Sequence, residues 1–355
     1  MHRHLAALFG ILLTLMAGCD TPQPDTGSFA ATLPPTQAAV ALATAVPTTQ
    51  LPPTNTVTAT LTPSATLTPT ATLTPSATIT LTASATYTPS HTPTLTPTPD
   101  SMAFFQLARP ISDDGTNWVD RSYPYGTTAQ GNWPVHHGVE FQNPKGTPVL
   151  ATADGEIYFA NDDSERQFGP RNGYYGNLVI IRHDFKSPEG LPVYTLYGHL
   201  NRIDVEAGQR IAQGERVGVV GDSGIAIGSH LHFEVRVGDP ESFATSRNPE
   251  LWIKPFSRYG VLAGRVVDEN GDLVPDKTLQ IRRAGKTIVF RYAYTYSDDP
   301  EINADMIWGE NFTVGDFPPD EYEVIVSERS GRIRYRGNVT ITSDTVTWIE
   351  VVLDS

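Results

Sequence analysis

Cysteine is nearly absent from this chain of 355 residues, which leaves no possibility of an internal disulfide framework. Cys19 is the single cysteine, so the folded part must be held together by its apolar core or by a bound metal. Positive charge is also scarce, since 25 Lys and Arg against 39 Asp and Glu give a net charge of −14. Binding to nucleic-acid phosphates requires a surplus of Lys and Arg, and this balance argues against such a partner.

Charged residues are missing altogether between Thr26 and Pro99. Thr, Pro, Ala and Ser dominate this stretch, and a hexad recurs as "LTPSAT", "LTPTAT" and "LTPSAT". Proline removes backbone donors, and the small side chains offer too little apolar area to offset the chain entropy lost in a packed core. We therefore expect residues 19–100 to form a disordered, extended stalk.

Long apolar runs are limited to the N-terminus. Residues 1–19, "MHRHLAALFGILLTLMAGC", have a basic start, an apolar run too short to span a bilayer, and small residues before Cys19, which predicts an export signal. The ending "LMAGC" resembles a bacterial lipobox. The resemblance implies a signal peptide over 1–18, lipidation of Cys19, and a lipoprotein anchored to the outer face of a bacterial membrane. A cleaved secretory signal with an incidental thiol is the alternative.

Amphipathic helical patterns are absent from residue 101 onward, and short strand-like runs take their place. The runs are rich in β-branched and aromatic residues and are separated by Gly, Asp, Asn and Pro. This pattern predicts an all-β fold, divided near residue 257 into two domains, 101–257 and 258–355. The expected strands of the first domain lie within residues 147–160, 176–184, 191–200, 215–221 and 229–237.

Histidine and carboxylate side chains recur at strand spacing in two short segments. In "VHHGVEF", alternation along a strand would put His136 and Glu140 on one face, with Gly138 leaving space between them. In "SHLHFEVR", the same alternation puts His230 and His232 on the face opposite the apolar residues. If the two strands are neighbours, two imidazoles and a carboxylate converge, a donor set that suits catalytic Zn²⁺ and also non-haem iron.

The segment from about 130 to 237 resembles the lysostaphin-like or LytM peptidases, the M23 family of zinc endopeptidases. The family pattern is His-x-x-x-Asp, then Tyr-x-His-Leu and a final His-x-His, and the chain has "HHGVE", "YGHL" and "HLH" in that order. The stretches "GTPVLATADGEIYFA", "VEAGQRIAQGERVGVVGDSG" and "GSHLHFEVR" also fit. The resemblance implies an antiparallel β-sheet peptidase domain that uses Zn²⁺ to hydrolyse peptide bonds in peptidoglycan stem peptides or cross-bridges.

The resemblance also implies a role for each motif residue. His136, Glu140 and His232 become the zinc ligands, and His199 and His230 become the unliganded catalytic histidines. Glu140 departs from the family, which has Asp there, and its extra methylene puts the catalytic rate rather than metal binding in question. We assign water orientation and proton transfer to His230, and stabilisation of the developing charge to His199.

For three further polar residues near these motifs we predict roles other than metal binding or catalysis. His137 should turn away from His136, and His183 should be hydrogen-bonded within the fold. Glu234 shares a face with the ligands and is expected to be either solvated or a support for a metal ligand.

Two other functional classes compete with the enzyme. Relatives that have lost ligands act as non-catalytic regulators, so a LytM-like regulator or a wall-binding lipoprotein is the alternative, although this chain keeps every histidine of the pattern. A lipoyl- or biotinyl-type carrier is excluded, because no lysine lies between Lys186 and Lys254.

Residues 258–355 resemble carboxypeptidase regulatory-like domains in the stretches "GRVVDENGDLVP", "NFTVGDFPPDEYEVIVSE" and "VTWIEVVLD". The resemblance implies an immunoglobulin- or transthyretin-like β-sandwich, with a structural role or with wall glycan or protein as its ligand. If the two domains are independent, removing the residues after 257 should leave cleavage of soluble peptides intact.

Overall fold

The computed structural model describes residues 104–354, and strands make up nearly all of the regular structure there. Two single-turn 3₁₀ helices, η2 (Phe243–Thr245) and η3 (Pro249–Leu251), complete it. The all-β prediction is therefore confirmed for these residues. None of their helices is long and apolar enough to cross a membrane. The expected export signal, the lipidated Cys19 and the stalk lie outside the described residues.

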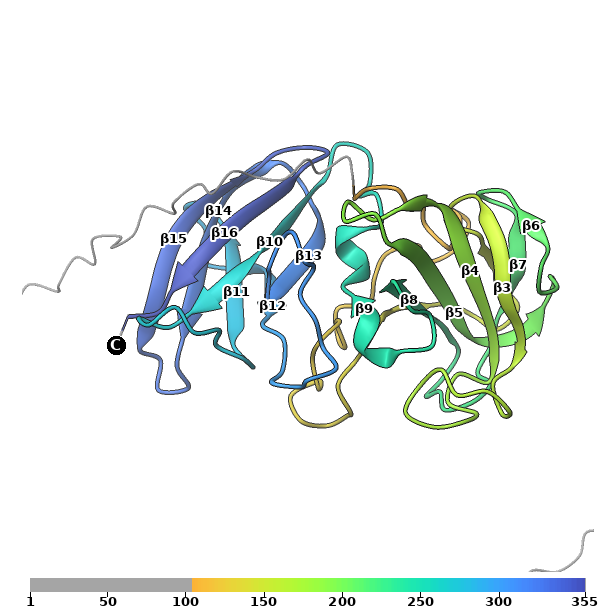
Figure 1. Cartoon of the computed structure of the whole chain (residues 1–355). Helices are drawn as coiled ribbons and strands as arrows, with labels where there is room; N and C mark the ends of the chain where they lie inside the picture. The colour runs from red at the N-terminus through yellow and green to blue at the C-terminus, as the bar shows by residue number, and fades with distance from the viewer. Residues whose placement is uncertain (1–103, 355) are drawn as a thin grey trace, which may run out of the picture. The chain divides into compact units, whose positions relative to one another are not determined.

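A nine-stranded sheet, drawn from yellow to green in Figure 1, organises the first half of the described chain. Its strand pairs are antiparallel, and their Val, Ile, Leu, Tyr and Phe side chains build the core. Six strands follow one another across the sheet in the order β1 (Val139–Gln142), β8 (His230–Val237), β5 (Pro192–Ile203), β4 (Asn177–Lys186), β3 (Gly155–Asp162) and β6 (Arg210–Ile211). The other three lie off this path. β2 (Pro148–Leu150) pairs with β7 (Arg216–Val220), β7 also pairs with β5, and β9 (Ser246–Arg247) pairs with β8.

The run 147–160, expected as one strand region, is divided between β2 and β3. The chain bends before Gly155, where the Asp154 carboxylate accepts a hydrogen bond from the Gln213 amide (2.7 Å). The other four expected strands of the first domain match β4, β5, β7 and β8 to within a few residues. In the sheet β8, β5, β4 and β3 lie side by side in that order and β7 pairs with β5. His230 and His232 lie on β8, and His199 lies on β5.

Two smaller sheets form the second half of the described chain. Both contribute to one core, which contains Leu262 and Phe312 from the first sheet and Leu279 and Tyr322 from the second, so the two sheets form a sandwich. Around Asn270–Gly271 a single antiparallel bridge joins Val267 to Leu273. The first sheet has the order β13 (Phe312–Phe317), β10 (Gly260–Val267), β16 (Val346–Val352), and the second has the order β12 (Val289–Tyr294), β11 (Thr278–Arg283), β14 (Asp320–Ser327), β15 (Ile333–Ile341).

Residues from both halves of the described chain share a hydrophobic core. The Phe104 ring lies 5.2 Å from the Trp252 ring and 5.5 Å from the Trp308 ring. Tyr125 meets Tyr296 edge to face at 5.2 Å. These five aromatic residues belong to one cluster of buried side chains, so the segment before β1 is packed against both the nine-stranded sheet and the residues that follow β10.

Candidate metal centre

The antiparallel pairing of β1 with β8 sets the register of the candidate site. Glu140 lies opposite His232, and Gln142 lies opposite His230. The alternate residues Phe141 and Phe233 are fully buried in the core, and this apolar face fixes the register, because a slip by one residue would bury the carboxylate. The polar face of the two strands therefore faces the site.

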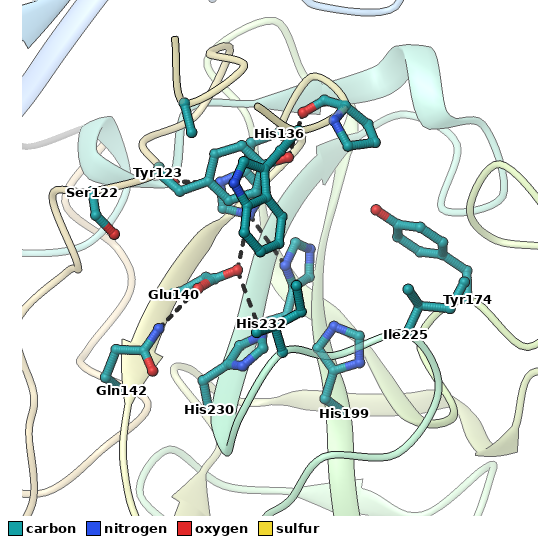
Figure 2. Close-up of a pocket in the computed structure, with 14 residues that line it drawn as sticks. Ser122, Tyr123, His136, Glu140, Gln142, Tyr174, His199, Ile225, His230 and His232 are labelled. Atoms are coloured by element: carbon teal, nitrogen blue, oxygen red, sulfur yellow. Dashed lines mark hydrogen bonds and ion pairs between the residues drawn. The ribbon is translucent and has the colours of Figure 1, made fainter. Parts of the chain in front are cut away.

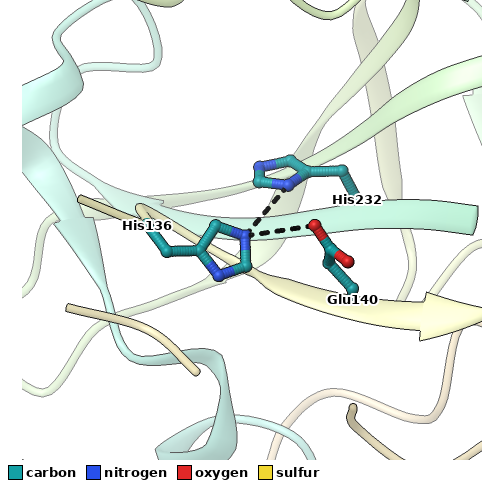
Figure 3. Close-up of side chains that lie close together, drawn as sticks. All are labelled: His136, Glu140 and His232. Carbon is teal, nitrogen blue, oxygen red and sulfur yellow. Dashed lines mark hydrogen bonds and ion pairs between the residues drawn. The ribbon is translucent and has the colours of Figure 1, made fainter. Parts of the chain in front are cut away.

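Three potential ligand atoms converge there, one each from His136, Glu140 and His232 (Figure 3), and all lie within 4.8 Å of one another. His136 Nε2 is 3.3 Å from His232 Nδ1 and 3.8 Å from Glu140 Oε1. Any two ligand atoms of a tetrahedral Zn²⁺ site, each about 2.0 to 2.1 Å from the ion, lie roughly 3.3 Å apart. The donor set and its spacing therefore fit a zinc ion with one position left for water.

His136 lies just before β1, and a loop rather than a strand positions it. Its Nδ1 donates a hydrogen bond to the carbonyl oxygen of Tyr123 (2.6 Å), and its ring stacks on the Tyr123 ring at 4.1 Å. The proton on Nδ1 leaves the Nε2 lone pair to face the other ligands. Burial, reinforced by His232, lowers the pKa of His136 well below its ordinary value, so the imidazole is held in the neutral form that binds metal.

The loop that holds His136 is itself anchored on both sides. Arg121 forms an ion pair with Glu250 and donates a hydrogen bond to the Gly315 carbonyl (3.1 Å). The Tyr125 hydroxyl donates to the carbonyls of Ser246 (3.1 Å) and Asn303 (3.2 Å). The position of one candidate ligand thus depends on residues from both halves of the described chain.

His199 and His230 lie beside the three ligands with their rings 4.9 Å apart. His199 Nδ1 donates to the Ser223 carbonyl (2.8 Å) and His230 Nδ1 donates to the Gly228 carbonyl (3.1 Å), which leaves Nε2 of each ring unprotonated. Burial, followed by repulsion from His232 and His230, lowers the pKa of His199 to about 3. Burial also lowers the pKa of His230, so both rings are available as proton acceptors.

A cleft of about 420 Å³ opens over these residues (Figure 2). Its lining includes the four histidines, Glu140, and an apolar wall with the large exposed side chains Trp133, Ile225 and Ile227. Such a wall can contact an extended peptide while the polar side of the cleft faces the bond to be cut.

The other three polar residues also have defined places. His137 turns away, as predicted, and lies 3.6 Å from the Phe243 ring with Nδ1 3.2 Å from Ser246 Oγ. His183 is hydrogen-bonded to Thr195 Oγ1 (2.8 Å), as expected. Glu234 is completely buried with Oε1 3.0 Å from His232 Nε2, which excludes the interpretation of Glu234 as a solvated group.

Two residues that support the ligands, Tyr123 directly and Arg236 through Glu234, were not anticipated from the sequence. Tyr123 acts through its backbone carbonyl and its ring, and no sequence signal reveals a carbonyl that will face a histidine 13 positions later. Arg236 is completely buried against Glu234, and strand alternation could have revealed it, since His232, Glu234 and Arg236 share one face of β8.

An antiparallel sheet that presents two histidines and a carboxylate to a cleft, beside two further histidines, defines a class of metal-dependent hydrolase sites. Residues 134–244 match the model of peptidase family M23. This part of the chain is therefore an M23 peptidase domain, and its buried His/Glu/His group indicates a metal site.

Two relatives each match about 30% of the chain. The DD-carboxypeptidase/endopeptidase Mpg of Neisseria meningitidis serogroup B is 40% identical over 109 residues, which are 30% of this chain and 22% of that protein. The peptidoglycan DD-endopeptidase ShyA of Vibrio cholerae serotype O1 is 35% identical over 102 residues, which are 29% of this chain and 20% of that protein. The chain thus spans about a fifth of the length of these relatives.

Among solved structures, the catalytic domain of lysostaphin from Staphylococcus simulans matches with 28% identity and a TM-score of 0.30, over 37% of this chain and 88% of that chain. The family match ends at residue 244, so the carboxypeptidase regulatory-like assignment of residues 258–355 and the boundary near 257 stay predictions.

Proposed function

We propose that the protein is a cell-envelope zinc metalloendopeptidase that hydrolyses peptide bonds in peptidoglycan. The observation that carries this proposal is the convergence of His136, Glu140 and His232 within 4.8 Å, in a cleft that is also lined by the imidazoles of His199 and His230. The activities that the names of the relatives Mpg and ShyA state support the choice of substrate.

The residues divide the chemistry between them. His136, Glu140 and His232 hold the zinc, which lowers the pKa of a bound water and polarises the scissile carbonyl. His230 Nε2 accepts a proton from the attacking water and returns it to the departing amine. We assign stabilisation of the oxygen that gains negative charge to His199, whose ring lies 4.9 Å from the His230 ring. Because Nε2 of the neutral ring is unprotonated, this role requires the ring to bind a second proton as the charge develops.

The charges along the cleft favour an internal peptide bond over a C-terminal one. Among the described residues that line the cleft, Glu140 carries negative charge and none is Lys or Arg. A carboxypeptidase binds a substrate whose free carboxylate lies one residue from the scissile bond, and that carboxylate would find no cationic partner here. An internal peptide bond whose following residue continues the chain, as in a stem peptide or a peptide cross-bridge, presents a neutral amide at the same place.

We further propose that lipid on Cys19 and the stalk confine the enzyme to the wall near the outer face of a bacterial membrane. Confinement raises the effective concentration of a hydrolase at its substrate. Under this proposal, residues 258–355 are an accessory β-sandwich that has a structural role or binds wall glycan or protein.

Mass spectrometry of peptidoglycan digested by residues 101–355 tests the proposed activity. We expect cross-linked peptides to be split at an internal bond while monomeric pentapeptides keep their terminal residue, and we expect one zinc per chain. His232→Ala, which removes a ligand, should lose both zinc and cleavage. A zinc-loaded protein that leaves several peptidoglycans intact would favour the non-catalytic regulator instead.

A further inference from the structure

A buried ion pair lies behind the His232 ring, on the side away from the other two ligands. Glu234 and Arg236 follow His232 at intervals of two residues on β8, and both are completely buried. Burying two charges costs several kcal/mol each unless every polar atom finds a partner. A pair in this position therefore needs an explanation beyond packing.

The partners of Glu234 account for its full hydrogen-bonding capacity. Its Oε2 accepts from Arg236 Nε (2.8 Å), and its Oε1 accepts from His232 Nε2 (3.0 Å) and from the Tyr175 hydroxyl. Arg236 also donates to the Tyr175 hydroxyl (3.0 Å) and to the Pro240 carbonyl (2.8 Å). The carboxylate is consequently fixed from two sides and directed at one nitrogen of the histidine ring.

Tyr175 extends this arrangement to a second residue of the site. Its carbonyl oxygen accepts a hydrogen bond from the backbone amide of His199 (2.8 Å). The same tyrosine therefore holds the carboxylate behind His232 and the backbone of the neighbouring histidine.

The glycine of "HHGVE" makes room for this arrangement. A Cβ atom on Gly138 would lie 2.9 Å from His232 Nε2 and 3.0 Å from Glu234 Cγ, and 2.5 Å from the Phe233 carbonyl oxygen. The space that the sequence suggested between His136 and Glu140 is thus occupied by the contact between His232 and Glu234.

We propose that Glu234 is a positioning residue for metal binding, which holds the His232 ring with the proton on Nε2 and the Nδ1 lone pair aimed at the metal, while Arg236 and Tyr175 hold Glu234. A carboxylate that accepts from the second nitrogen fixes the tautomer and ring orientation of a metal-binding histidine and raises its basicity. The inference rests on the metal site of the proposed function, and it assigns a task to a buried ion pair that contacts no substrate.

Zinc affinity of the full-length protein, measured by competition with a chelator, tests the proposal in two variants. Glu234→Gln keeps the shape of the side chain but removes its charge, and we expect zinc to bind about 10- to 100-fold more weakly. Glu234→Gln combined with Arg236→Gln removes both charges, so no buried charge lacks a partner, and we expect a similar loss of affinity in a folded protein. Co²⁺ bound in place of zinc should show a changed visible absorption spectrum in both variants.

Glu310→Gln controls for replacing a buried carboxyl side chain by its amide, because Glu310 is also completely buried but contacts no candidate ligand, and it should bind zinc as the wild type does. Zinc affinity within twofold of wild type and an unchanged Co²⁺ spectrum in the double variant would overturn the inference. A wild-type protein that binds no zinc would instead overturn the proposed function.

Discussion

Glu140 is one methylene longer than the aspartate of the family pattern, and the structure shows where the extra length goes. Its Oε1 lies 3.8 Å from His136 Nε2 and 3.5 Å from His230 Nε2. The carboxylate therefore contacts a proposed proton acceptor as well as reaching the metal position. Its second oxygen accepts a hydrogen bond from Gln142 (3.0 Å), which keeps the side chain in this orientation.

We expect Glu140→Asp to keep zinc bound and to hold or raise activity. Shortening the side chain withdraws the carboxylate from His230 and frees its Nε2 for the attacking water. Because a well-placed proton acceptor contributes about 10²- to 10⁴-fold, a rise in kcat/KM of up to roughly tenfold is expected, measured with cross-linked muropeptides. Glu140→Gln is the control and should bind zinc more weakly. An aspartate variant that binds zinc but cleaves less than wild type would contradict the role given to the longer side chain.

The sequence predicted which residues meet at the site better than it predicted how they are held there. Strand alternation brought His136, Glu140 and His232 to one face, although β1 begins at Val139 and His136 lies outside it. The geometry at His136 comes from the Tyr123 carbonyl, and a backbone atom carries no signature of residue type. Glu234 was expected to be either solvated or a support for a metal ligand, and the sequence could not decide between the two because it does not reveal that this face of the strand is covered.

At the scale of elements, the pairing of β1 with β8 builds the site, and Gly138, just before β1, lies so close to β8 that it has no room for a side chain. We expect Gly138→Ala to lower the free energy of unfolding by about 1–3 kcal/mol, because the new methyl group would press on the Phe233 carbonyl at 2.5 Å. Zinc affinity should fall by at least tenfold, since the displaced ring of His232 is a metal ligand.

Gly131→Ala provides the comparison for this variant. Gly131 lies in the same segment, has a φ of +84° and has open space around its Cβ position. Its substitution should cost backbone strain of about 1 kcal/mol and leave zinc affinity unchanged. Equal zinc affinities for the two variants, measured by chelator competition, would show that the contact at Gly138 does not matter for the metal.

Strands with a clear apolar alternation were predicted well, and short or polar ones were not. The expected strand at residues 229–237, for example, matches β8 within one residue. β6 is two residues long, and β15, "IRYRGNVTI", carries arginines and an asparagine that hide its alternation. Such strands form because neighbouring strands pair with them. This pairing depends on the tertiary structure, and local strand propensity does not reveal it.

At the scale of the whole described chain, the shared aromatic core argues against independent stability of residues 101–257. The Trp308 side chain is only 3% exposed and packs against Phe104. Trp308→Ala should lower the free energy of unfolding by about 3–5 kcal/mol in denaturant titrations. Trp118→Ala, at a side chain that is 57% exposed, should change it by less than about 0.5 kcal/mol.

Truncation after residue 257 should accordingly lower the melting temperature and the cleavage of soluble peptides, contrary to the expectation for independent domains. Removal of the later residues would also take away the partners of Arg121 and Tyr125 that anchor the His136 loop. A truncated protein as stable and as active as residues 101–355 would show that the shared core contributes little to stability or activity.

The stability of the protein should depend on pH through Glu310, a buried carboxylate beside this core. Its oxygens accept hydrogen bonds from the Tyr296 hydroxyl (2.9 Å) and the Asp305 amide (3.0 Å). Burial, reinforced by Asp305, raises the pKa of Glu310 to about 8. The folded protein therefore keeps this proton over a range in which the unfolded chain, with a glutamate pKa of about 4.3, has lost it.

Because the folded state binds the extra proton, stability is greatest below the unfolded pKa and falls as pH rises towards 8. The slope should be about −1.4 kcal/mol per pH unit between pH 6 and pH 8, a window above the pKa of about 6 to which burial raises Asp305. Urea titrations at several pH values should show this slope in the wild type and in Glu301→Gln, which alters an exposed carboxylate of the same loop. Glu310→Gln cannot lose the proton and should flatten the profile, whereas an unchanged slope in that variant would assign the pH dependence to another group.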